Sequence, residues 1–156
     1  MSKSLKRVLK DATERGLTLT PLRLDDGTLT AADAAAAAGC TAAEIVKSVV
    51  LRSPETGEHF LFLTAGSNRV DLGRAGAVAG QTVEMADAES IRRITGFAIG
   101  GVSPFGHLTP LRVWIDPEIL GFATVWAAAG TPHHIFEIEP ETLRAATEAV
   151  PAAFTL

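Results

Sequence analysis

Lys47 is the first residue whose type and position could serve chemistry. It lies in the segment Ile45–Leu51, where β-branched residues predict a strand. In an extended chain the residues that share its face are Ile45, Val49 and Leu51, and those on the other face are Val46, Ser48 and Val50. Both faces are apolar, so we expect both to be buried and the Lys47 ammonium to point toward an interior or a pocket. A buried unpaired charge is costly, so the ammonium needs a carboxylate, an open cleft or a lowered pKa.

This lysine has two interpretations. It could lie at the end of the strand, with its alkyl chain on apolar surface and its amine in water. It could instead be a pocket lysine that contacts an anion or polarises an oxygen.

A glycine-rich loop is the second candidate, with the sequence GGVSPFG over residues 100–106. Gly100 and Gly101 would let the backbone approach a ligand closely, and Pro104 would fix the local path. Unpaired loop amides can bind a phosphate or stabilise an oxyanion, although a tight structural turn would have the same composition. The spacing fits neither a Walker loop nor a dinucleotide-binding fingerprint.

The remaining polar candidates are weaker. His133 and His134 are adjacent and point in opposite directions in an extended chain, and no zinc-ligand spacing occurs. Ser103 lacks a nucleophile-elbow context. Cys40 follows a predicted helix end, where the helix dipole would raise the pKa of its thiol. We therefore expect no covalent nucleophile, no metal and no cofactor.

The composition bounds the function further. The chain has 156 residues, of which 47% are hydrophobic, one cysteine and a net charge of −4. Aromatic residues make up only 6%, which disfavours a stacking surface for single-stranded nucleic acid. No apolar stretch approaches the roughly 20 residues of a membrane span, and no secretory signal is recognisable, so we expect a cytoplasmic protein without membrane contact.

The charge is unevenly distributed. Residues 1–23 carry a net charge of +4, which leaves −8 for the rest of the chain. The basic residues of the first helical pattern could form a solvated face, or they could contact an anionic partner. The four candidates for that contact are Lys3, Lys6, Arg7 and Lys10.

Periodicity and turn signals predict a single α/β domain over residues 1–156, with a mixed, mostly antiparallel sheet. Helices are predicted over Ser2–Arg15, from Thr30 to Gly39, from Asn68 to about Ala79, from Asp87 to Gly96 and from Pro140 to about Ala149. In the third of these helices we expect Asn68 as the cap and Asp71 at the third position. Strands are predicted over Leu17–Leu24, Ile45–Leu51, His59–Leu63, Thr82–Met85, Arg112–Ile115, Ala123–Ala128 and Ile135–Ile138.

Several segments together resemble one family. EIVKSVVL, HFLFLTAG, NRVDLGRAG, VEMADAESIRRITGFAIGGVSPFG and FATVWAAAGTPHHIFEIEPETL are similar to the YbaK/ProX family of aminoacyl-tRNA deacylases, free-standing relatives of the editing domain of bacterial prolyl-tRNA synthetase. The resemblance runs from about Thr41 to Leu143. The lysine in an apolar strand, followed by TGF and the Gly-x-x-x-Pro loop, carries most of it.

The resemblance implies a barrel-like sheet flanked by helices and hydrolysis of a wrongly attached amino acid from tRNA. It implies catalytic roles for Lys47, Gly100 and Gly101. The substrate-binding residues that it implies are Val102, Ser103, Pro104 and Asp71. The expected partner is the acceptor end of a mischarged tRNA, and the family relationship adds an aminoacyl-tRNA synthetase as a second candidate partner. The GTPHH segment replaces a double glycine found in some members.

Two other hypotheses for the function stay open. The chain could be a noncatalytic module that binds a nucleotide or an RNA end, because its charge is acidic and no obvious general base is present. It could also hydrolyse small esters unrelated to tRNA. Steep weakening of binding with salt would favour tRNA over a small ester.

Overall fold

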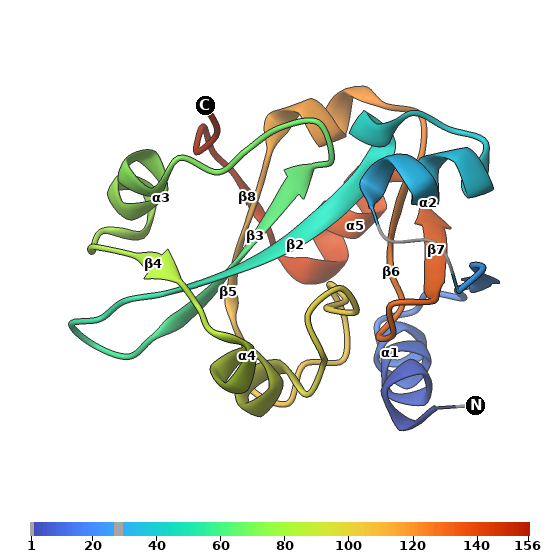
Figure 1. The fold of residues 1–156 in the computed structure, drawn as a ribbon, viewed down its shortest axis with the longest axis horizontal. Helices are drawn as coiled ribbons and strands as arrows, with labels where there is room; N and C mark the ends of the chain where they lie inside the picture. The colour runs from blue at the N-terminus through green and yellow to red at the C-terminus, as the bar shows by residue number, and fades with distance from the viewer. Residues whose placement is uncertain (1, 27–29) are drawn as a thin grey trace.

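The computed structural model describes residues 2–26 and 30–156. Its elements form a mixed α/β fold, as the sequence predicts (Figure 1). The α-helices are α1 (Lys3–Glu14), α2 (Ala31–Ala38), α3 (Leu72–Ala79), α4 (Ala88–Thr95) and α5 (Pro140–Thr147), and the 3₁₀ turns are η1 (Ala42–Glu44) and η2 (Pro117–Gly121). The strands are β1 (Leu22–Arg23), β2 (Ile45–Arg52), β3 (His59–Ala65), β4 (Glu84–Met85), β5 (Arg112–Ile115), β6 (Val125–Ala128), β7 (His134–Ile138) and β8 (Val150–Pro151).

The strands form one mixed sheet in the order β1-β7-β6-β2-β3-β5-β8, with β4 paired to β2. The ladders β1–β7, β6–β7, β2–β3 and β2–β4 are antiparallel, and β2–β6, β3–β5 and β5–β8 are parallel. The hairpin of β2 and β3 crosses the molecule, with α3 and α2 on either side of it (Figure 1). The strand order places both of these strands inside the sheet, with β2 between β6 and β3 and with β3 between β2 and β5.

Apolar packing covers both faces of the hairpin. Every residue of β3 is buried, and its side chains alternate between two clusters. Leu61 and Leu63 belong to the larger cluster, with Phe105 and Phe136, whereas Phe60 packs on the other face against Trp114. A third, smaller cluster joins α2 to β2 and β7. Any polar side chain in the middle of β2 therefore lies next to a layer of packed apolar residues.

Most predicted helix ends are confirmed. Thr30 and Asp33 form the capping box of α2, Asp87 caps α4, and Pro140 opens α5. The predicted strand over residues 17–24 is wrong in length, because only β1 pairs with β7. No helix among the described residues combines the length and hydropathy that a membrane span requires.

The predicted cap at Asn68 is wrong. The α3 helix begins at Leu72, and Asp71 is its N-cap, accepting hydrogen bonds from the amides of Gly73 at 2.9 Å and Arg74 at 3.3 Å. The Asn68 amide group instead donates to Asp116 at 2.8 Å and to Glu118 at 2.9 Å. A distant carboxylate therefore competes successfully for a residue whose local sequence favours a cap.

Candidate functional site

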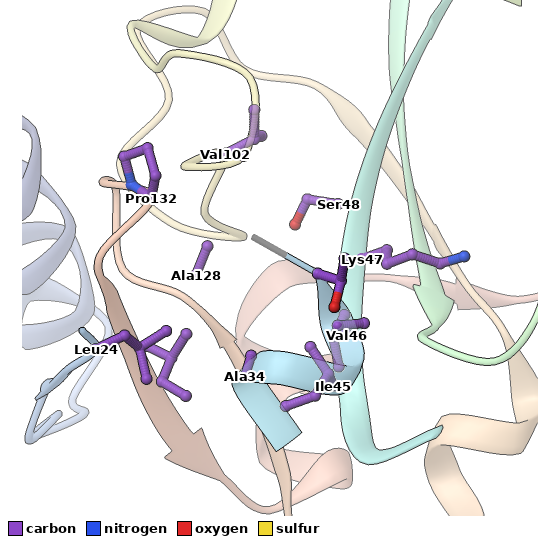
Figure 2. Close-up of a pocket in the computed structure, with 13 residues that line it drawn as sticks. Leu24, Ala34, Ile45, Val46, Lys47, Ser48, Val102, Ala128 and Pro132 are labelled. Atoms are coloured by element: carbon purple, nitrogen blue, oxygen red, sulfur yellow. The ribbon is translucent and has the colours of Figure 1, made fainter. Parts of the chain in front are cut away.

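A cavity of about 270 Å³ lies between α2, the start of β2, the glycine-rich loop and the turn between β6 and β7. Figure 2 shows side chains converging on it from these elements. Its wall is mainly aliphatic, with few polar groups. The lining residues are Leu24, Thr30, Ala31, Ala34, Ile45, Val46, Lys47, Ser48, Gly100, Val102, Ala128, Pro132 and Ile135. An apolar recess with a few polar groups is the usual form of a small-ligand site.

The α2 helix supplies the small residues of this wall. Ala31 and Ala34 are one helical turn apart and therefore lie on the same face. Ala34 is buried and packs in the cluster with Leu24 and Ile135. A larger side chain at this position would occupy the cavity.

The loop contributes Gly100 and Val102 to the lining. Within the described chain the amides of these two residues donate to no protein acceptor. The Gly101 amide, in contrast, donates to the Ala98 carbonyl at 3.0 Å. A Cβ on Gly101 would lie 2.9 Å from the Thr131 backbone, so only glycine permits this close packing. The expected role of the Gly101 amide as a donor to substrate is therefore corrected, and Gly100 and Val102 are the candidates.

Ser103 and Pro104 serve the scaffold in this structure. The Ser103 hydroxyl accepts from the Phe105 amide at 3.2 Å, and the Ser103 carbonyl accepts from His107 Nε2 at 2.6 Å. Burial lowers the pKa of His107, which favours the neutral ring. Pro104 lines a separate cavity with His107. Of the three loop residues predicted to bind substrate, Val102 alone lines the cavity described above.

Lys47 lines the same cavity, but its amine points away from it (Figure 2). Nζ donates to the Asn68 carbonyl on the opposite side of β2. The pKa of Lys47 lies below its ordinary value, first because burial disfavours the ammonium and second because the Arg69 cation repels it, while Asp116 acts in the opposite sense. The expectation that the ammonium faces the Gly100–Gly101 amides across the cavity is therefore corrected.

A buried carboxylate holds the acceptor of this lysine in place. Asp116 is 3% exposed and accepts hydrogen bonds from the Ala65 amide at 3.2 Å and from Asn68 Nδ2 at 2.8 Å. Its other oxygen accepts from the Glu118 amide at 3.0 Å. The carboxylate thus fixes the turn after β3, and with it the Asn68 carbonyl that Lys47 contacts.

Ser48 is a site residue that the sequence interpretation does not single out. Its hydroxyl points into the cavity in Figure 2, and Oγ is buried without a hydrogen-bond partner. The available signal was strand alternation, because a serine between Val46 and Val50 is polar on an otherwise apolar face. A buried hydroxyl without a partner is costly, so a bound molecule that supplied one would gain from it.

The basic residues of α1 divide into two groups. Lys3, Lys6 and Lys10 are exposed, and Lys10 makes a surface ion pair with Glu14 at 3.9 Å. Arg7 is turned inward, where its guanidinium donates to the Gly106 carbonyl at 2.6 Å. The proposed contact of Arg7 with a nucleic-acid backbone is corrected for this reason.

The other titratable candidates lie outside this arrangement. The pKa of the Cys40 thiol is raised, mainly by burial and then by Glu44 and Glu137. The direction agrees with the expected unreactive thiol, whereas the helix dipole is not the principal cause. His134 Nδ1 lies 2.7 Å from the Thr131 hydroxyl. In the described ranges no three His, Cys, Asp or Glu side chains are grouped closely enough to hold a metal ion.

Comparison with known proteins identifies the family. The model of the aminoacyl-tRNA editing domain matches residues 25–146, and the chain therefore belongs to this family, of the YbaK/ProX type. The crystal structure of a "putative trans-editing enzyme for prolyl tRNA synthetase" is 42% identical, with a TM-score of 0.94 over 100% of this chain and 99% of that one.

Two further relatives match over most or all of the chain. A structure solved for epitope backbone grafting onto scaffold proteins is 39% identical, with a TM-score of 0.93 over 100% of this chain and 99% of that one. The uncharacterized protein YwhH of Bacillus subtilis (strain 168) is 28% identical over 90% of this chain and 88% of its own length.

Asp71 is absent from the cavity lining, and its capping hydrogen bonds account for its position. Asp71→Ala should lower the free energy of unfolding by about 1 kcal/mol, because it removes the cap of α3. Asp71→Asn should retain most of that stability, since asparagine is also a good cap. Urea denaturation measures both changes. A loss of catalytic activity in a fully stable Asp71→Asn protein would restore the substrate-binding role.

Proposed function

We propose that this chain is a trans-editing aminoacyl-tRNA deacylase, which hydrolyses the ester between a wrongly attached amino acid and tRNA. The observation that carries the proposal is the cavity itself, where a mainly apolar wall includes Ser48 and two loop residues, Gly100 and Val102, whose amides donate to no acceptor in the described chain. Membership of the aminoacyl-tRNA editing family supports the same reaction. In this proposal residues 1–156 act as one unit, because the α1 helix packs against the glycine-rich loop.

The chemistry requires positioned groups and no protein nucleophile. Water attacks the ester carbonyl carbon and loses one proton to solvent, which gives a tetrahedral oxyanion that the amides of Gly100 and Val102 stabilise. The carbon–oxygen bond to the ribose then breaks, and the ribose oxygen takes up a proton as the free amino acid leaves. By resemblance to the family, the neighbouring 2′-hydroxyl of the terminal ribose helps to place the water. Fixing these partners in one geometry accounts for the acceleration.

The aliphatic wall selects the amino acid. Ala31 and Ala34 leave room for the side chain of the aminoacyl group, and Ser48 offers the group a hydrogen bond. A pocket of this kind distinguishes one methylene by about 1–3 kcal/mol. Such limited discrimination is the reason why a second, hydrolytic selection step is useful.

Lys47 contacts the part of the substrate outside the cavity. Its amine lies on the far side of β2 from the apolar wall, and burial, followed by the nearby Arg69 cation, lowers its pKa. An anion placed between two cations would relieve their repulsion. We therefore assign Lys47 to a phosphate of the acceptor end, and not to the aminoacyl carbonyl. The exposed Lys3, Lys6 and Lys10 contact the tRNA backbone further away, and an aminoacyl-tRNA synthetase is a proposed partner.

The direct test is a panel of tRNAs, each charged with a noncognate amino acid. At least one member should lose its amino acid faster than the spontaneous rate, and Lys47→Ala should slow that release. The measurement is the acid-precipitable labelled amino acid that remains with time. Salt-sensitive binding without release from any member would support the noncatalytic module instead. Release from small esters alone would support the hypothesis that the chain hydrolyses small esters unrelated to tRNA.

Filling the cavity should impair the reaction. Ala34→Leu places a larger side chain in the wall, and we expect kcat/KM for the best substrate to fall about 10- to 200-fold. Ala37→Leu is the matched control, because Ala37 is exposed on the same helix and does not line the cavity. Thermal melting confirms that both variants are folded. Equal activity of the two variants would remove the cavity from the mechanism.

The rate should also depend on the charge of Lys47. As pH rises through the lowered pKa, the ammonium loses its proton, so enzymatic turnover should decline below the ordinary lysine pKa of about 10.4. Lys47→Arg retains a cation throughout this range, and its profile should lack that decline. The spontaneous hydrolysis of the ester is subtracted at each pH. An identical alkaline decline in both proteins would assign it to another group.

A further inference from the structure

The α1 helix holds both hydrogen-bonding groups of one loop residue. Arg7 Nε donates to the Gly106 carbonyl at 2.6 Å, and Asp11 Oδ2 accepts from the Gly106 amide at 2.7 Å. The two side chains are four residues apart and therefore lie on one face of the helix. Gly106 ends the glycine-rich loop whose other end, at Gly100 and Val102, lines the cavity.

Arg7 also connects the two ends of the segment 96–106. Its Nη2 atom donates to the Gly96 carbonyl at 3.0 Å and the Thr95 carbonyl at 3.4 Å, and its guanidinium lies 4.7 Å from the centre of the Phe97 ring. The planar guanidinium presents several donors in a fixed arrangement, which a lysine ammonium does not. One side chain thus closes the base of the loop.

The backbone of α1 packs against the same loop and against a second one. Gly106 has a φ of +80°, and a Cβ there would lie 3.1 Å from Val8 atoms. A Cβ on Gly130 would lie 2.8 Å from the Ser4 carbonyl oxygen. The loop that contains Gly130 leads to Pro132, which lines the cavity beside Gly100. One helix face therefore fixes both loops that border the site.

We propose that Arg7 and Asp11 are positioning residues, which hold the loop so that the Gly100 and Val102 amides meet the developing oxyanion. This inference rests on the proposed deacylase function. Arg7 touches no substrate in this assignment, because its donors are directed at backbone carbonyls. Donors that act on the transition state raise kcat, whereas a direct contact with the tRNA backbone would lower KM.

The experiment compares variants of these two residues on one mischarged tRNA. Arg7→Lys keeps the charge but loses the bidentate geometry, and we expect kcat to fall at least about tenfold with KM changed less than about twofold. Asp11→Ala should behave in the same way. Asp11→Asn retains an acceptor oxygen for the Gly106 amide, so it should recover most of the rate. Thr13→Ala is the control on the exposed face of the same helix.

The opposite kinetic pattern would overturn the inference. A rise in KM with unchanged kcat for Arg7→Ala, together with normal behaviour of Arg7→Lys, would make Arg7 a simple charge contact with tRNA. Equal loss of kcat in Asp11→Asn and Asp11→Ala would also contradict it, because the acceptor would then have no effect.

A second measurement is independent of turnover. Hydrogen exchange of peptides that span residues 97–108 should accelerate in Arg7→Lys and Asp11→Ala relative to Thr13→Ala, while exchange in β2 and β3 stays unchanged. Unchanged exchange in the loop would contradict the positioning role of Arg7 and Asp11. If the wild-type protein released no amino acid from any tRNA, the deacylase proposal would fail, and altered exchange would still show that α1 holds the loop.

Discussion

The alternation of side chains along β2 is the constraint on which the site depends. The β2 strand lies between β3 and β6 in the sheet, and apolar clusters pack on both of its faces. Each of its side chains must therefore point to one face or the other. Ser48 points into the cavity, and Lys47 points to the turn after β3. The same strand thus supplies a neutral hydroxyl to the apolar side and a cation to the polar side. A shift of the strand by one residue would exchange these two groups.

The glycine-rich loop obtains its shape from residues distant in the sequence. Its glycines permit close contacts, with Gly101 against Thr131 and Gly106 against Val8. His107 and Arg7 donate hydrogen bonds to its carbonyl groups, and Asp11 accepts one from its Gly106 amide. A loop held in this way needs little reorganisation when charge develops on a substrate, which is the property that electrostatic stabilisation requires.

The polar side of β2 is organised by Asp116. This buried carboxylate accepts hydrogen bonds from Ala65, Asn68 and Glu118, so its negative charge is compensated locally. The turn that it fixes presents the Asn68 carbonyl to Lys47. The lysine is thereby kept at the edge of the cavity, where burial and Arg69 lower its pKa. A bound anion would favour the charged form of this lysine.

The sequence by itself determined the helices with clear caps, the hairpin of β2 and β3, the mixed α/β class and the family resemblance, because each depends on local spacing or on motifs read in order. It also showed that Lys47 and Ser48 lie on opposite faces. Only the tertiary structure decided which face meets the glycine-rich loop and that Arg7, unlike Lys6, turns inward. Arg7 and Gly106 are 99 residues apart, and Asn68 and Asp116 are 48 apart. No local pattern encodes such pairs, because they form only when the packed layers bring their backbones together.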